Sequence, residues 1–173
     1  AFTAINRVDD FAMTPQQNIA HASTTFMAQN RGAGKIERMK KGFFNSILLQ
    51  AVYTAVIAVV TFFFARQIMK LFVGENSEEV VSLGVSYLVL IAPMYVMPAA
   101  TNIIQGYFRG LGDLKVTLIS TILNMSARFL TAWLMIHIMH GSFDRLAWAN
   151  FFGWVAMLAF QIPMITHRWK KVK

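Results

Sequence analysis

The chain has 173 residues, of which 56% are hydrophobic and 14% are charged, whereas a soluble domain has about 25% charged residues. Its net charge is +8 and it contains no cysteine, which excludes disulfides, cysteine metal sites and thiol nucleophiles. A soluble fold of this length could not hide five helix-length apolar segments, so we predict an all-α polytopic membrane protein. The basic residues lie in short loops and a tail, where they set membrane orientation and do not indicate nucleic-acid binding.

The first predicted helix covers residues 2–29 and is the least apolar of the five. It carries Asp9 and Asp10, the only carboxylates that we predict within a spanning segment, and Gln17 further along. Polar side chains in spanning helices normally face the bundle interior or a water-filled cavity, so we expect these three to line a cavity. Pro15 lacks an N–H group and should bend or locally open the helix.

The two carboxylates allow three interpretations. In the functional one, Asp9 or Asp10 binds a cation or a proton. In the second, Arg7 and Asp10, which lie three residues apart on one helix face, neutralise each other. In the third, this stretch lies in water at the outer interface. Asp9 is the better functional candidate, because Arg7 is less able to occupy it.

The next segments are a basic loop and a long apolar helix. Gly32 and Gly34 should end the first helix, because glycine tolerates the positive φ of a helix C-cap. Residues 35–41 are predicted to form a short basic surface helix. Residues 43–65 have no charged side chain over 23 positions. They would make about 35 Å of helix, enough to cross a hydrocarbon core of about 30 Å.

The third predicted helix, residues 80–107, contains Pro93 and Pro98. Two prolines five positions apart should bend or partly unwind its centre. Its second half carries Asn102 and Gln105, which could line a polar cavity or serve as hydrogen-bond partners between helices.

The fourth predicted helix, residues 114–139, is interrupted by Arg128 and also carries Asn124. A charge inside a spanning helix is costly and should face a cavity or a partner. Arg128 could hold an anionic group, pair with a carboxylate of the first helix, or extend its charge to the membrane surface. Asn124 could line the cavity or join helices. A fifth helix, residues 146–166, and a basic tail follow.

The distribution of Lys and Arg predicts the orientation. The loop after the first helix, the turn after the third and the tail carry eleven of them, whereas the two loops on the opposite side carry three. By the positive-inside rule the first group is cytoplasmic. We therefore expect a multi-pass protein of the plasma (inner) membrane with its C-terminus in the cytoplasm.

Signals for catalysis are missing from the sequence. The four histidines show no metal-ligand spacing on one helix face, and neither a nucleotide-binding glycine loop nor a nucleophile elbow is present. We expect no enzymatic activity, no cofactor and no nucleic-acid partner. The expected surroundings are the lipid bilayer.

Two glycine-rich strings end the first and third helices. The strings are Gln29-Asn30-Arg31-Gly32-Ala33-Gly34-Lys35, followed by Arg38, and Gly106-Tyr107-Phe108-Arg109-Gly110-Leu111-Gly112-Asp113-Leu114-Lys115. Together, in this order and with two helices between them, they resemble the MATE (multidrug and toxic compound extrusion) family. That family carries similar Q-N-x-G-A-G/D-K/R-x-x-R and G-x-x-R-G-x-G-D/N patterns. The resemblance covers nearly the whole chain.

The resemblance implies a twelve-helix transporter of two lobes, in which residues 1–173 correspond to helices eight to twelve of the C-terminal lobe. The N-terminal lobe and helix seven would be absent. It also implies a secondary antiporter that exports small organic cations or drugs in exchange for Na⁺ or H⁺, by rocking of its lobes. Several subfamilies couple through carboxylates of the first, seventh and tenth helices. Here the segment matching the tenth helix has no Asp or Glu between residues 80 and 108, so the coupling site stays open.

Two other functions remain open at this point. A flippase of lipid-linked precursors has a related architecture and would favour a basic cavity, which Arg128 could supply. Alternatively, the chain is a non-transporting, truncated membrane subunit, because five helices alone have no obvious way to enclose a two-sided pathway.

Overall fold

The computed structural model describes residues 2–73, 78–137 and 146–171, and these residues form helices and short turns without any strand. The helices, in chain order, are α1 (Phe2–Gly32), α2 (Ile36–Val73), α3 (Glu78–Ile91), the 3₁₀ helix η1 (Ala92–Tyr95), α4 (Val96–Gly110), α5 (Leu114–His137) and α6 (Leu146–Lys171). The predicted all-α class is therefore confirmed.

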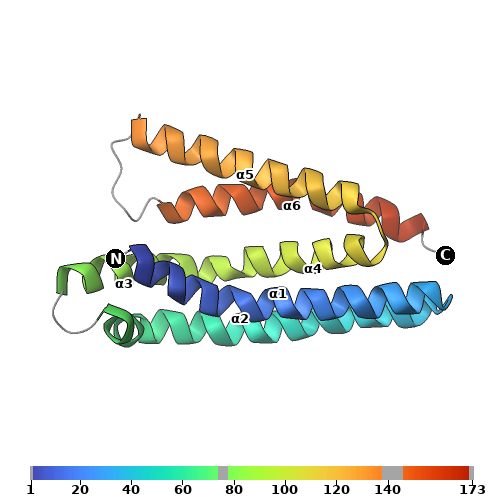
Figure 1. The fold of residues 1–173 in the computed structure, drawn as a ribbon, viewed down its shortest axis with the longest axis horizontal. Coiled ribbons are helices and arrows are strands. Elements are labelled where there is room, and N and C mark those ends of the chain that lie inside the picture. The colour runs from blue at the N-terminus through green and yellow to red at the C-terminus, as the bar shows by residue number, and fades with distance from the viewer. Residues whose placement is uncertain (1, 74–77, 138–145, 172–173) are drawn as a thin grey trace.

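The helices lie alongside one another in an elongated bundle (Figure 1). Helices α1 and α2 form one antiparallel pair and α5 and α6 form another, while α4 contacts α1, α2, α5 and α6. The turns from α1 to α2 and from α4 to α5 lie at the same end of the bundle as the C-terminus, opposite the N-terminus (Figure 1). This is the grouping that the charge distribution predicts.

Four described segments are long and apolar enough to cross a membrane: Ile36–Val73, Glu78–Gly110, Leu114–Met135 and Ala147–Trp169. Helix α1 has 31 residues, which is ample length for a fifth span, but it is too polar to qualify by hydropathy. One side of it packs against α2 and α4, whereas its polar residues Arg7, Asp10 and Gln17 are exposed.

The outer surface of the bundle is strongly apolar. Phe63 on α2 and Phe129 on α5 are each 71% exposed, and further large apolar side chains of both helices are exposed. A soluble protein rarely shows apolar surface on this scale, whereas hydrocarbon chains would cover it in a bilayer. The exposed apolar faces of α2 and α5 are therefore typical of a membrane protein.

Helix α2 is longer than predicted. The predicted surface helix at residues 35–41 and the predicted span at 43–65 join into one helix that continues to Val73. Gly42 does not interrupt it, since one glycine costs a helix only about 1 kcal/mol, and here it lets the Phe26 ring approach closely. A kink occurs at Phe64, whose φ and ψ are −108° and 16°.

The prolines have different effects. Helix α1 continues through Pro15, so the helix does not open there; near it, Tyr53 donates its hydroxyl to the carbonyl of Ala12 at 3.1 Å. Pro93 lies in η1, where the backbone tightens to a 3₁₀ helix between α3 and α4. The centre of this span is thus irregular, as predicted, but its backbone tightens instead of unwinding. Pro98 lies in the first turn of α4, where the missing N–H group is tolerated.

Candidate functional site

Asp9 is the centre of a hydrogen-bonded cluster from four elements. Tyr95 of η1 donates its hydroxyl to Oδ1 of Asp9 at 2.8 Å, and Tyr87 of α3 donates to Oδ2 at 3.2 Å. Asn150 of α6 donates its amide to the Tyr87 hydroxyl at 3.2 Å. The cluster therefore joins α1 to the α3–η1–α4 segment and to α6. We call Asp9, Tyr87, Tyr95 and Asn150 the Asp9 cluster.

The 3₁₀ turn positions one of the two donors. Pro93 is the second residue of this turn, and Tyr95 ends it with its side chain buried. A 3₁₀ helix advances about 2.0 Å per residue and has 3.0 residues per turn, so Tyr95 faces a direction that a continuous α-helix would not give it. The irregular turn that contains Pro93 thus positions a residue of the candidate site.

Arg7 and Asp10 do not form the predicted ion pair. Both are exposed, and no ion pair of either within 4 Å is present among the described residues. Asp9 is the partly buried member of the two carboxylates and the one with hydrogen-bond partners. The intrahelical-pair interpretation is therefore wrong for this structure.

Arg128 lies in the contact between α5 and α6. Its guanidinium forms no ion pair with Asp9 or Asp10 in the described part of the chain. Its aliphatic stem packs across Gly153 of α6, where a Cβ atom would come within 2.3 Å of Arg128 Cγ. The side chain therefore fills the α5–α6 contact with its carbons, and the predicted cross-lobe pair with the first helix is not formed.

The predicted polar lining residues have different surroundings among the described residues. Gln17 is exposed, whereas its neighbour Gln16 is fully buried and donates to Thr54 Oγ1 at 3.4 Å. Gln105 donates to the Met157 sulfur at 3.8 Å.

Asn102 and Asn124 form no hydrogen bond with Asp9 among the described residues. Both are half-buried, and Asn124 Nδ2 is buried without a hydrogen-bond partner among the described residues. Asn124 lies beside Gly153, so it belongs to the α5–α6 contact. The sequence thus predicts Asp9 as a site residue but not its partners. Tyrosines are common packing residues, and one asparagine in an apolar helix does not by itself indicate a site.

The two glycine-rich strings have the same turn geometry. Lys35 N donates to Asn30 O at 2.8 Å, and Asp113 N donates to Phe108 O at 2.9 Å. These six-to-one bonds are those of a Schellman helix end, which needs a residue of positive φ. Gly34 and Gly112 provide it, with φ of 70° and 69°. Gly32 has no positive φ and lies within α1, so its predicted capping role is wrong.

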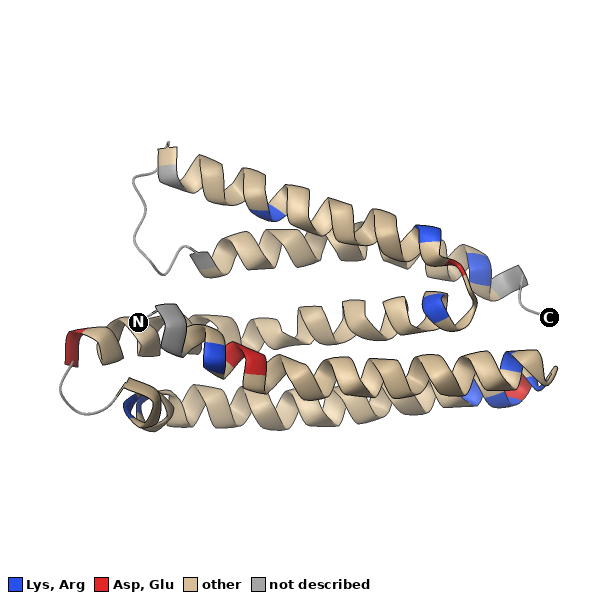
Figure 2. Cartoon of the chain, in the orientation of Figure 1, with Lys and Arg blue, Asp and Glu red and all other residues tan. Residues whose placement is uncertain are grey.

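The two strings also touch each other. Arg31 donates from Nη1 to the carbonyl of Leu111, and Arg168 of α6 donates to Asp113 Oδ2 at 2.7 Å as an ion pair. These contacts tie the ends of α1 and α6 to the α4–α5 turn. Figure 2 shows the positive residues concentrated at this end of the bundle.

Gly106 and Gly110 act inside a helix and not as caps. A Cβ atom on Gly106 would lie 2.9 Å from Ala20 O, and one on Gly110 would lie 3.0 Å from Thr24 O. Thr24 also donates to Gly106 O at 3.2 Å. The spacing of four residues places both glycines on one face of α4, as in the small-residue contacts of membrane helices.

The other string residues support these contacts. Asn30 is buried and donates to Phe26 O at 2.8 Å. Arg38 stacks over the Phe26 ring at 5.8 Å, half-buried Arg109 donates to Gln105 O at 3.4 Å, and Gln29 is exposed. The strings therefore build helix ends and a close helix contact.

The apolar spans, the exposed apolar surface and the embedded carboxylate cluster define a polytopic helical membrane protein with a polar site inside the bundle. The family model MatE matches residues 1–134, so the chain belongs to the MATE family of transporters. No curated protein gives a significant match.

One solved structure is similar, described as the inward-facing conformation of a multidrug resistance MATE family transporter of the MOP superfamily. The TM-score is 0.86 and the sequence identity 19%, over 99% of this chain and 40% of that chain. The chain thus has the fold of part of a MATE transporter and spans less than half of that protein's length.

Proposed function

We propose that this chain is the C-terminal lobe of a two-lobe secondary antiporter, which exports small organic cations in exchange for Na⁺ or H⁺. Family membership and the likeness to 40% of a multidrug MATE transporter support the two-lobe arrangement. The missing lobe would then complete the pathway. The observation that carries the coupling role is the Asp9 cluster, since it places a carboxylate inside an apolar bundle with two hydroxyl donors on its oxygens.

The cluster suits reversible binding of a cation. Both Asp9 oxygens accept hydrogen bonds from tyrosine hydroxyls, and such bonds are stronger when the acceptor is ionised. A proton, Na⁺ or a cationic substrate would compete for these oxygens, and the tyrosine hydroxyls could turn to present oxygen lone pairs instead. No group of three or more His, Asp or Glu side chains able to hold a metal occurs among the described residues, so any Na⁺ site would combine Asp9 with uncharged oxygens.

Asp9 is hydrogen-bonded to residues on both sides of Pro93 in the span that contains η1. Occupation of Asp9 by a cation would weaken its bonds to Tyr87 and Tyr95, which lie on either side of Pro93. A ligand shifts a conformational equilibrium by the difference in its affinity for the two states. We propose that release or formation of these two bonds biases the inward-open and outward-open states through η1.

The orientation proposed for the membrane follows from charge. The end of the bundle with the two glycine-rich strings carries most Lys and Arg (Figure 2). We propose that the protein lies in the plasma (inner) membrane, with this end of the bundle and the C-terminus in the cytoplasm. The flippase alternative depends on Arg128, whose stem packs against Gly153 of α6 and which forms no ion pair with Asp9 among the described residues.

The experiment is transport by the complete protein in proteoliposomes. A fluorescent organic cation such as ethidium is loaded, and a Na⁺ gradient or a pH gradient is imposed in separate runs. The proposal expects ethidium movement against the flow of one of these ions, and collapse of that movement when the gradient is dissipated by an ionophore. Ethidium movement that is independent of both gradients would exclude antiport. Transport of a lipid-linked precursor without ethidium movement would favour the flippase.

A further inference from the structure

Asn150 lies on a face of α6 that is buried beside the Asp9 cluster. Ala147 and Trp154 share this face, three residues before Asn150 and four after it, and both are buried. They belong to the same apolar core as Tyr87 and Tyr95. An apolar side chain between them would pack without a polar group to satisfy, so packing alone does not require an asparagine here.

The direction of the hydrogen bonds gives Asn150 a distinct role. A phenol hydroxyl has one proton, and an ionised carboxylate can only accept. Tyr87 donates its proton to Oδ2 of Asp9 at 3.2 Å, and its oxygen accepts from the Asn150 amide at 3.2 Å. Successive hydrogen bonds of this kind strengthen one another. The Asn150 donor therefore favours the arrangement in which Tyr87 points its proton at Asp9.

The same amide also carries an acceptor oxygen. When a proton or another cation occupies Asp9, the Tyr87 hydroxyl gains less by donating to it and can turn away. Its proton then needs a new acceptor, and Oδ1 of Asn150 supplies one after rotation of the amide. An apolar side chain at this position would serve neither arrangement.

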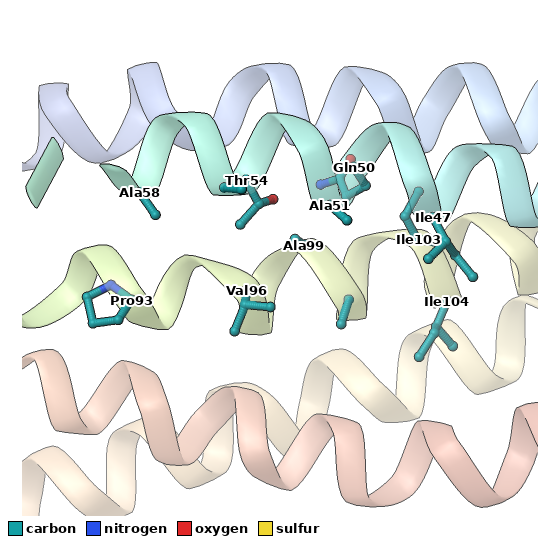
Figure 3. Close-up of a pocket in the computed structure, with 12 residues that line it drawn as sticks. Ile47, Gln50, Ala51, Thr54, Ala58, Pro93, Val96, Ala99, Ile103 and Ile104 are labelled. Atoms are coloured by element: carbon teal, nitrogen blue, oxygen red, sulfur yellow. The ribbon is translucent and has the colours of Figure 1, made fainter. Parts of the chain in front are cut away.

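The span that carries the tyrosines has room to move beside η1. A cavity of about 380 Å³ lies between α2 and the η1–α4 segment, with Pro93 and Val96 in its wall (Figure 3). The turn is therefore incompletely packed on this side, whereas Tyr95 bonds it to Asp9 of α1. Movement of the turn can thus follow a change in the bonds of the Asp9 cluster.

We propose that Asn150 is a positioning residue for Asp9. It holds Tyr87 as a donor while Asp9 is ionised, and it accepts from Tyr87 when Asp9 is occupied. Since α3 and α6 have few other contacts, a shift of α6 would break this link and change how readily Asp9 takes a cation. The inference deepens the proposed coupling role, and its meaning for transport rests on that proposal.

The test is carbodiimide labelling of Asp9 in the complete transporter, in detergent at fixed pH, without gradient or substrate. Carbodiimides attack protonated carboxyl groups, so the labelling rate of the Asp9 peptide, followed by mass spectrometry, reports how readily Asp9 takes a proton. Tyr87→Phe should raise this rate about tenfold, the effect of losing one hydrogen bond to a charged group. Asn150→Leu should raise it about threefold, because it removes only the support of that bond. In the Tyr87→Phe background, Asn150→Leu should have no further effect.

The matched control is Gln161→Leu, which also replaces a buried amide of α6 by leucine. Neither amide atom of Gln161 has a hydrogen-bond partner among the described residues, so this variant should leave the Asp9 labelling rate unchanged. The other ionisable groups that act on the cluster, namely Tyr95, Asp10 beside Asp9, and Arg128, whose charge acts on Tyr87, stay the same in all these variants.

A second variant, Asn150→Asp, keeps the test decisive if Asn150→Leu folds poorly. It has the same shape but offers Tyr87 a charged acceptor in place of a donor, and it should raise the Asp9 labelling rate at least tenfold, since two effects act together. Unchanged labelling in the folded Asn150 variants would overturn the inference. An equal increase by Asn150→Leu with and without the Tyr87 hydroxyl would also overturn it.

The labelling result is separate from transport. Normal ethidium transport by Asp9→Asn, together with the labelling pattern expected above, would refute the antiport role and leave the positioning role intact. Loss of transport in Asp9→Asn, with labelling that does not respond to Asn150→Leu, would refute the positioning role alone.

Discussion

Tyr95 donates its hydroxyl to Oδ1 of Asp9 across 2.8 Å, so the 3₁₀ turn inside one membrane span is bonded directly to the carboxylate of another helix. In the Tyr95→Phe variant the ring stays and the donor is lost. A hydrogen bond to a charged group contributes about 1.5–3 kcal/mol, and we expect at least a fivefold shift in the ion concentration that gives half-maximal transport. The measurement is ethidium transport against ion concentration.

The matched control for that variant is Tyr53→Phe. Tyr53 also donates a hydroxyl to α1, but to the backbone carbonyl of Ala12. It should alter stability slightly and leave the ion dependence unchanged. Equal shifts in both variants would mean that the Asp9 contact has no special part in ion binding.

Alanine at Gly106 or Gly110 should force α1 and α4 apart. The added Cβ atoms would come within 2.9 Å of Ala20 O and 3.0 Å of Thr24 O, and overpacking of this kind costs about 1–3 kcal/mol. Thermal unfolding of the complete transporter measures the loss. Gly32→Ala is the control, because nothing lies within 4 Å of its Cβ position, and it should melt like wild type. Unchanged melting of both α4 variants would show that this contact is not close.

Because Gly112 has a positive φ, the stability cost of a substitution there should depend on the side chain introduced. At φ of 69°, valine should lower stability by about 1–2 kcal/mol, whereas asparagine, which visits this region, should cost much less. Melting temperatures of Gly112→Val and Gly112→Asn compare the two. Equal effects of the two side chains would contradict a left-handed turn at this position.

The ion pair between Arg168 and Asp113 should contribute little by itself. Its atoms are 2.7 Å apart, but the two side chains are 46% and 19% exposed, and such surface pairs contribute about 0.2–1 kcal/mol. A double-mutant cycle with Arg168→Ala and Asp113→Ala should give a coupling energy in that range, which falls in high salt. A coupling energy well above it would mean that the pair holds α6 in place more strongly than an ordinary surface pair.

Much of the fold could be predicted from the sequence, because the spans are continuous apolar segments and the helix ends have glycines. The predicted break between residues 41 and 43 was wrong, since Gly42 packs against Phe26 instead of ending a helix. Asp9 could be named as a rare embedded carboxylate. Its partners could not, because Tyr87 and Tyr95 lie 78 and 86 residues away along the chain and only tertiary packing brings them together.

The most direct test of the coupling role compares Asp9→Asn with Asp10→Asn in the complete transporter, under an imposed Na⁺ or pH gradient. The two carboxylates are adjacent in sequence, but Asp9 accepts both tyrosine hydroxyls and Asp10 is exposed. Gradient-driven ethidium transport should be abolished by Asp9→Asn and retained by Asp10→Asn, with equal amounts of folded protein. Normal transport by Asp9→Asn would remove this carboxylate from the mechanism and leave the Asp9 cluster a structural contact between helices.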